Sequence, residues 1–235
     1  VAMFILNREK IPLGRSTAIV LITALMDNLF YIVVIPVVFL FISQEQLFPD
    51  GSETSQGIFW LGYTIIFTVC TILFVSIFVF PKLIKTIIVT VFRLPILRRW
   101  KEDAIQTGDD VIITSKELGG MKPRYWISSF GATILSWTAR FLVINFILMI
   151  VVNVGLIDHF LIFGRQLVMW LIMLVSPTPG GSGVAEWAFS EFLGQFSVSV
   201  LVISGLAFLW RLISYFPYLI IGPILLPRWL RRTRK

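Results

Sequence analysis

The chain has 235 residues, of which 57% are hydrophobic and only 14% are charged. A soluble globular domain is usually about 25% charged, so this chain has too few charged residues to cover a water-facing surface. The net charge of +7 does not indicate nucleic-acid binding, because the basic residues follow the ends of apolar runs. We therefore expect one membrane domain over residues 1–235, with an all-α fold.

Long apolar runs predict helices that cross a bilayer, because a spanning helix needs about 20 mostly apolar residues. The fourth run is short for a crossing, and a Pro/Gly-rich turn and a ten-residue helix at 184–193 follow it. The last run contains Pro217 and Pro223, so we expect a kink in it. The predicted runs are 17–42, 58–80, 125–152, 160–175 and 198–226.

Lys and Arg gather in the N-terminal flank, in the 81–123 loop and in the C-terminal tail. Short loops rich in these residues stay in the cytoplasm. The 43–57 segment carries Glu45, Asp50 and Glu53 and no Lys or Arg, so it should lie outside. We therefore expect a multi-pass protein of the cell inner (plasma) membrane with the three basic segments in the cytoplasm.

Two parts of the 81–123 loop differ in character. Residues 93–100 mix Arg, Leu, Ile and Trp, which suits a segment in the membrane interface. Capture of anionic headgroups is one interpretation of this segment, and simple anchoring of the topology is the favoured one. The 102–117 stretch is polar and predicts a solvated turn or a short helix.

The 160–175 run and the 184–193 helix cannot both cross the membrane. The third span ends outside, and the last must start outside to leave the basic tail inside. The 184–193 helix would rise only about 15 Å at 1.5 Å per residue, so it cannot cross a core about 30 Å thick. We therefore expect a re-entrant helical hairpin over 160–193, whose turn lines a cavity because irregular backbone is not exposed to lipid.

Ionised side chains inside the predicted spans are rare and point to function. Asp27 lies near the middle of the first span, Arg140 well inside the third and Arg211 near the middle of the last. Glu186 lies in the first turns of the returning helix. Ion pairs that only hold helices together are the alternative, but an unpaired buried charge is costly, so we expect the four to converge on one polar cavity.

The turn of the hairpin has properties of an anion site. Its glycines permit positive φ, and its prolines end the incoming helix. Ser182 is expected to cap the returning helix, whose free N–H groups suit an anion such as phosphate. The turn reads Ser176-Pro177-Thr178-Pro179-Gly180-Gly181-Ser182-Gly183.

At these residues the sequence resembles a known family. Pro179-Gly180-Gly181-Ser182-Gly183-Val184-Ala185-Glu186 resembles the Pro-Gly-Gly-x-Gly-x-x-Glu motif of the lysylphosphatidylglycerol synthase transmembrane, or flippase-like, family. Arg211-Leu212-Ile213-Ser214-Tyr215 is similar to the Arg-x-x-(Ser/Thr)-Tyr pattern of its last helix. Asp27 is similar to the acid of its Glu-Arg-x-x-Asp stretch, although Thr23 and Ala24 stand in place of Glu-Arg. The resemblance covers essentially the whole chain and implies an N-terminal truncation.

The resemblance implies a flippase or transporter that binds or translocates a phospholipid or lipid-linked headgroup in an intramembrane cavity. Two alternatives stay open: the membrane half of an aminoacyl-phosphatidylglycerol synthase, and a non-transporting structural subunit. The substrate-binding residues expected from the pattern and the resemblance are Asp27, Arg140, Pro179, Gly180, Gly181, Ser182, Gly183, Glu186, Arg211 and Tyr215.

The chain shows no Ser–His–Asp set, no metal cluster and no phosphate loop, so we expect no catalytic residues, metal or cofactor. Asp158, His159 and Arg165 fall near the outer edge of the membrane, where a solvated role is expected. A homo-oligomer is compatible with the sequence.

Overall fold

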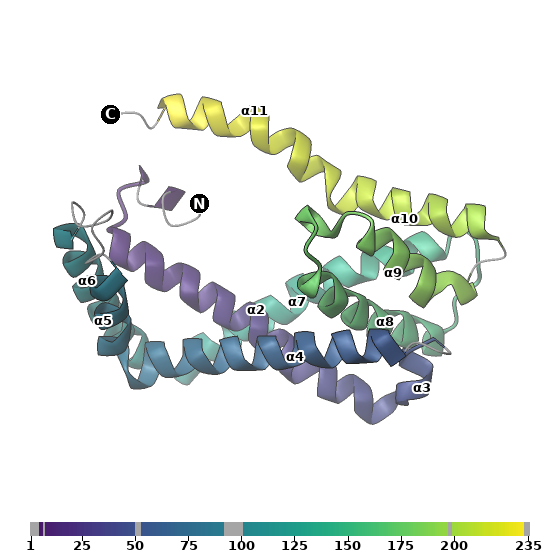
Figure 1. Ribbon diagram of the computed structural model, residues 1–235, viewed down its shortest axis with the longest axis horizontal. Helices are drawn as coiled ribbons and strands as arrows, with labels where there is room; N and C mark the ends of the chain where they lie inside the picture. Colours follow the sequence, from purple (N-terminus) through teal and green to yellow (C-terminus); the bar gives the residue numbers. More distant parts are fainter. Residues whose placement is uncertain (1–4, 7, 50–52, 92–100, 197–198, 233–235) are drawn as a thin grey trace. The chain divides into compact units, whose positions relative to one another are not determined.

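The computed structural model describes residues 5–6, 8–49, 53–91, 101–196 and 199–232, and the regular structure in these ranges is entirely helical (Figure 1). The prediction of an all-α polytopic membrane protein is confirmed. Five helical segments of the described chain are long and apolar enough to cross a bilayer: Arg15–Phe41, Glu53–Val79, Pro123–Leu148, Leu156–Val175 and Val200–Arg232.

The first three predicted spans form helices within a few residues of their expected bounds. These are α2 (Leu13–Phe41), α4 (Glu53–Phe74) and α7 (Pro123–Leu148). A π-helical turn, Val75–Val79, extends α4. The extension stops before Pro81, because proline lacks the N–H that would continue the helix.

Contacts along the chain define two compact units. The first comprises Val1–Leu29 and Phe67–Thr133 together with Lys235, and the second comprises Phe30–Ile66 and Ile134–Arg234. The single domain expected over 1–235 stays a prediction.

In the first unit, most of the predicted 81–123 loop is a pair of helices, α5 (Pro81–Val91) and α6 (Lys101–Gly119). Lys85 Nζ contacts Asp109 Oδ1 at 2.6 Å, and Gly108 lets the two helices approach, because a Cβ there would lie 2.6 Å from Lys85 Cγ. The polar stretch therefore forms a 19-residue helix, longer than the turn or short helix expected. The expected interfacial segment at 93–100 lies outside the described residues.

The second unit contains the predicted hairpin, made of α8 (Leu156–Val175), a 3-10 turn (Pro179–Gly181) and α9 (Val184–Leu193). Figure 1 shows α9 folded back along α8. The expectation that the incoming helix is too short to cross is wrong, because α8 has 20 residues. It begins at Leu156, where the Gly155 N–H donates to Asp158 Oδ2 at 3.1 Å and stabilises the helix start.

Aromatic packing and close backbone contact build the core of the second unit. Phe30 and Tyr31 contact Trp137 with ring centroids 5.8 and 5.2 Å apart. Gly62 brings α4 against α8, since a Cβ there would lie 3.0 Å from the Leu171 carbonyl oxygen. Gly164 does the same for the short helix α3 (Gln44–Leu47), since a Cβ there would lie 2.7 Å from Leu47 Cδ2. Small residues at such contacts are typical of membrane helix packing.

The last predicted span is broken, as its prolines indicate. It consists of α10 (Val200–Ser214) and α11 (Phe216–Arg232), which are separated at Tyr215. Pro217 stands in the first turn of α11, where its missing N–H has no intrahelical partner to lose. The break lies four residues after Arg211, so it adjoins the residues of the hairpin turn that Arg211 contacts.

Candidate functional site

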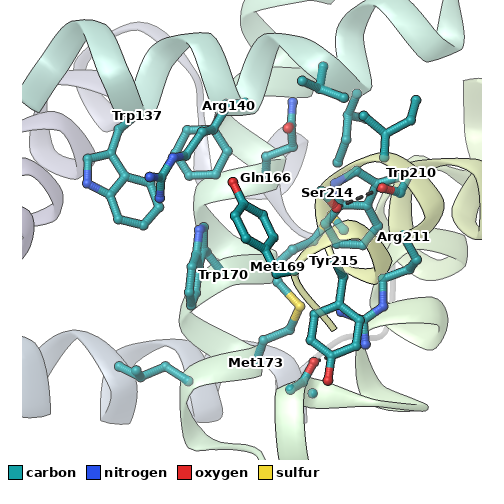
Figure 2. Close-up of a pocket in the computed structure, with 18 of the residues that line it drawn as sticks. Trp137, Arg140, Gln166, Met169, Trp170, Met173, Trp210, Arg211, Ser214 and Tyr215 are labelled. Atoms are coloured by element: carbon teal, nitrogen blue, oxygen red, sulfur yellow. Dashed lines mark hydrogen bonds between the residues drawn. The ribbon is translucent and has the colours of Figure 1, made fainter. Parts of the chain in front are cut away.

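A pocket of about 790 Å³ lies in the second unit between α7, α8, the hairpin turn, α10 and the start of α11. Most of its surface is apolar and aromatic, with a few polar side chains among the rings. Figure 2 shows Arg140 beside Trp137 on one side of the pocket and Arg211 with Tyr215 on the other. Its wall includes Trp137, Arg140, Gln166, Trp170, Arg211 and Tyr215.

Arg211, in the last turn of α10, joins that helix to the hairpin turn. Its Nε donates to Glu186 Oε1 at 2.9 Å and its Nη2 donates to the Gly180 carbonyl oxygen at 2.9 Å. The guanidinium carbon also lies 4.4 Å from the ring centroid of Tyr215. Arg211 is only 7% exposed, so these contacts offset the cost of removing its charge from water.

Glu186 connects Arg211 to the start of α9. Its Oε2 accepts a hydrogen bond of 2.7 Å from the Gly183 N–H, while Oε1 accepts from Arg211. The helix cap is therefore Gly183, with φ of 83°, and the expectation that Ser182 caps α9 is wrong. A positive φ favours glycine, and the carboxylate three residues later takes over the capping.

Position 180 favours glycine because of its backbone conformation and because of a close neighbouring side chain. Its φ is 65°, and a Cβ built there would lie 2.5 Å from the Tyr215 hydroxyl oxygen. Gly181 has a similar φ of 67°. The glycines predicted to permit positive φ in the turn therefore do so, and the tyrosine ring fills the space that a side chain at Gly180 would need.

Arg140 differs from Arg211 in having no acidic partner among the residues that the structure describes. Its guanidinium carbon lies 5.0 Å from the Trp137 ring centroid, a cation–π distance. The side chain is exposed and lines the pocket. Arg140 is thus the cation of the pocket whose charge no described carboxylate balances.

A buried chain of amides leads to the pocket from the start of α8. Asn145 Nδ2 donates to the His159 carbonyl oxygen at 2.9 Å and lies 3.0 Å from His159 Nδ1. Asn145 Oδ1 accepts from Gln166 Nε2 at 2.8 Å. Within the described chain, Gln166 Oε1 is buried and has no hydrogen-bond partner, and Gln166 lines the pocket.

The structure brings most of the predicted substrate-binding residues together. Pro179, Ser182, Gly183 and Glu186 lie in the hairpin turn or the first turn of α9. Asp27 lies in α2 within the first unit, so its grouping with the others stays a prediction. Five members of the predicted set line the pocket itself: Arg140, Gly180, Gly181, Arg211 and Tyr215.

The solvated role expected for Arg165 is wrong. Arg165 is 5% exposed, and its Nε and Nη2 donate to the Gln46 carbonyl oxygen at 2.9 and 2.7 Å. Its Nη1 donates to the Phe192 carbonyl oxygen at 2.6 Å, at the end of α9 where a cation is favourable. Asp158 and His159 are half-buried and hydrogen-bonded to Gly155 and Asn145.

Sequence reasoning also missed Gln166 and Asn145. Both are single amides in apolar helices, and an uncharged polar residue there is a weaker signal than a charge. Among the described His, Cys, Asp and Glu side chains, no group of three or more could hold a metal ion. The absence of a metal or cofactor in the whole protein stays a prediction.

Comparisons with known proteins place these residues in a family context. A sequence profile for the lysylphosphatidylglycerol synthase TM region matches residues 1–222. The chain is also 32% identical over 129 residues to a UPF0104 membrane protein of Archaeoglobus fulgidus. That match covers 54% of this chain and only 35% of the relative. No solved structure matches the chain.

Proposed function

The chain belongs to the family of the lysylphosphatidylglycerol synthase transmembrane region, and from this premise we propose that it binds the headgroup of a membrane lipid and moves it between leaflets. The pocket between α7, α8 and α10 holds the headgroup. The phosphate lies against Arg140, and the aromatic wall contacts the apolar part of the lipid. The proposal assigns no chemical reaction to the pocket.

The uncompensated charge of Arg140 is the observation that carries the proposal. Arg211 is neutralised by Glu186, so this pair holds the hairpin turn and adds little net charge to the pocket. Arg140 lines the same pocket, where its guanidinium lies over the Trp137 ring and forms no salt bridge with a described carboxylate. A guanidinium among apolar walls attracts phosphate, because its planar fork of donors matches the phosphate oxygens.

Two lengths support a re-entrant hairpin whose turn lies near mid-membrane. Arg165 contacts Gln46, which belongs to the 43–57 segment expected outside. Val175, the end of α8, follows Arg165 by ten residues, or about 15 Å, which is half of a core about 30 Å thick. Phe192, at the end of α9, returns to Arg165, so both arms of the hairpin span the same depth.

We also propose an orientation for the chain in the membrane. The basic N-terminal flank, the 81–123 segment and the C-terminus face the cytoplasm, and the protein lies in the plasma membrane. The positive-inside bias of these segments supports this arrangement. Glycosylation tags or cysteine labelling of sites placed in the 43–57 segment and after α11 would test it.

Lipid movement is tested with the protein reconstituted in vesicles that contain phosphatidylglycerol labelled on an acyl chain. Dithionite added outside bleaches labelled lipid as it reaches the outer leaflet. In vesicles with the native chain we expect dithionite to bleach more than half of the label. In vesicles with Arg140→Gln, the rate at which inner-leaflet label is bleached should be lower by about tenfold or more. A charge-assisted hydrogen bond contributes about 1.5–3 kcal/mol, which is tenfold or more in affinity.

The matched control is Arg228→Gln, which removes an exposed arginine of α11 and should leave the rate unchanged. Native mass spectra of both variants would show whether lipid binding and lipid movement change together. Equal rates for the native chain and Arg140→Gln, in vesicles that hold equal amounts of folded protein, would contradict the proposal.

A further inference from the structure

The orientation of the Asn145 amide is fixed by a backbone carbonyl. The His159 carbonyl oxygen only accepts hydrogen bonds, so the group 2.9 Å from it must be the Asn145 NH₂. The second hydrogen of that NH₂ points to His159 Nδ1, which therefore acts as an acceptor. Asn145 Oδ1 is left to face Gln166.

The same argument fixes the orientation of the Gln166 amide. Because Asn145 presents an oxygen, Gln166 must present its NH₂ to it, and the 2.8 Å contact shows this arrangement. The Oε1 of Gln166 is then the end without a partner. Gln166 is 2% exposed, and a buried acceptor without a hydrogen bond is costly. We therefore expect Oε1 to accept a hydrogen bond from a group outside the described chain.

We propose that Gln166 Oε1 accepts a hydrogen bond from the headgroup whose phosphate lies against Arg140, so that the pocket selects headgroups with a hydroxyl or ammonium hydrogen. This inference rests on the proposed function. Gln166 lines the pocket from α8 and Arg140 from α7, and Figure 2 shows both residues among its labelled lining.

The other polar groups of the pocket support this division of roles. Arg140, Arg211 and the indole N–H groups of Trp170 and Trp210 are donors and suit phosphate oxygens. The Ser214 hydroxyl hydrogen is already used, since it goes to the Trp210 carbonyl oxygen at 2.7 Å, and only the hydroxyl oxygen can still accept. Gln166 is the amide of the lining and offers a strong acceptor. A quaternary ammonium, which has no N–H, gains nothing from it.

Two pairs of acyl-labelled lipids test the selection at constant headgroup charge. Phosphatidylglycerol carries hydroxyl donors and phosphatidylmethanol carries none; phosphatidylethanolamine carries N–H donors and phosphatidylcholine carries none. In reconstituted vesicles we expect the native chain to move the donor-bearing lipid of at least one pair about three- to tenfold faster, as one hydrogen bond allows. The pair that responds identifies a hydroxyl or an ammonium donor.

Gln166→Met keeps the length of the side chain and removes both polar atoms, so the ratio within the responding pair should fall to about one. The ratio does not depend on how much protein folds, so a purely structural defect slows both lipids and leaves it unchanged. Gln195→Met, the same substitution at an exposed site after α9, should keep the native ratio.

Three results separate this inference from the proposed function. Equal rates within both pairs for the native chain overturn the inference alone. A native ratio retained by Gln166→Met overturns it as well. Failure of the native chain to move any of the four lipids faster than protein-free vesicles overturns the proposed function and the inference with it.

Discussion

Arg211 Nε and Glu186 Oε1 lie 2.9 Å apart and join the last turn of α10 to the first turn of α9. The same guanidinium holds the Gly180 carbonyl oxygen, so one side chain connects a helix, a turn and a helix start. This is the ion pair between helices that the sequence left as an alternative to a binding role. Because Glu186 neutralises Arg211, Arg140 is the charged residue of the pocket lining that has no acidic partner among the described residues.

Removing Arg211 should destabilise the hairpin. Arg211→Met removes the donor of Glu186 Oε1 and of the Gly180 carbonyl, while Glu186 Oε2 keeps the Gly183 N–H. The Glu186 side chain is 43% exposed, so water will hydrate the freed Oε1. We expect a loss of about 1–3 kcal/mol in the free energy of unfolding. Thermal unfolding in detergent, followed by tryptophan fluorescence, measures it. Adding Glu186→Gln to Arg211→Met should cost little more; fully additive losses would contradict the pairing.

Gly180→Ala should separate the hairpin turn from α10. The new Cβ meets the Tyr215 ring, and a positive φ costs a non-glycine residue about 1–2 kcal/mol. We expect a lower unfolding temperature and slower lipid movement. Gly205→Ala is the matched control, because no atom lies within 4 Å of its Cβ position and alanine favours the helix. If both variants unfold like the native chain, the close contact with Tyr215 is not needed.

Arg165→Lys should fail to replace arginine although it keeps the charge. The guanidinium donates from three separate nitrogens to the carbonyl oxygens of Gln46 and Phe192. The single nitrogen of a lysine ammonium cannot reach both carbonyls in the same way. We expect a loss of about 2–4 kcal/mol in unfolding free energy, since hydrogen bonds from charged donors are strong. Arg228→Lys on α11 should change stability by less than about 0.5 kcal/mol, as exposed substitutions do. Comparable losses at the two sites would argue against a special role for Arg165.

Asn145→Leu and His159→Phe should affect headgroup preference differently. Asn145→Leu removes the group that orients Gln166, so its amide can turn and the preference for donor-bearing lipids should weaken. His159→Phe removes only the ring and keeps the backbone carbonyl that fixes Asn145, so most of the preference should remain. Transport ratios for the four lipids in vesicles measure both. Loss of the preference in His159→Phe alone would show that the ring, not the carbonyl, orients the amide.

Much of the fold follows from local sequence signals. The spans were predictable because about 20 apolar residues in a row have few alternatives to crossing a bilayer. The hairpin turn and the break near Pro217 were predictable because Gly and Pro restrict or free the backbone locally. The length of α8 was not, because its start depends on a cap formed by Gly155 and Asp158.

The site was predictable only in part. Charges in apolar helices drew attention to Arg140, Glu186 and Arg211, and the structure places them in or beside one pocket. The roles of Arg165 and Gln166 depend on groups far along the chain or in a neighbouring helix. Arg165, for example, binds a carbonyl 119 positions away, and no local pattern marks such a partner.

The division of the last span at Tyr215 has a mechanical consequence. Arg211, which precedes the break, is tied to the hairpin, whereas Tyr218 follows it on α11 and forms part of the pocket wall. A change in the direction of α11 at Tyr215 would therefore move the pocket wall at Tyr218 while Arg211, Glu186 and Gly180 keep their hydrogen bonds.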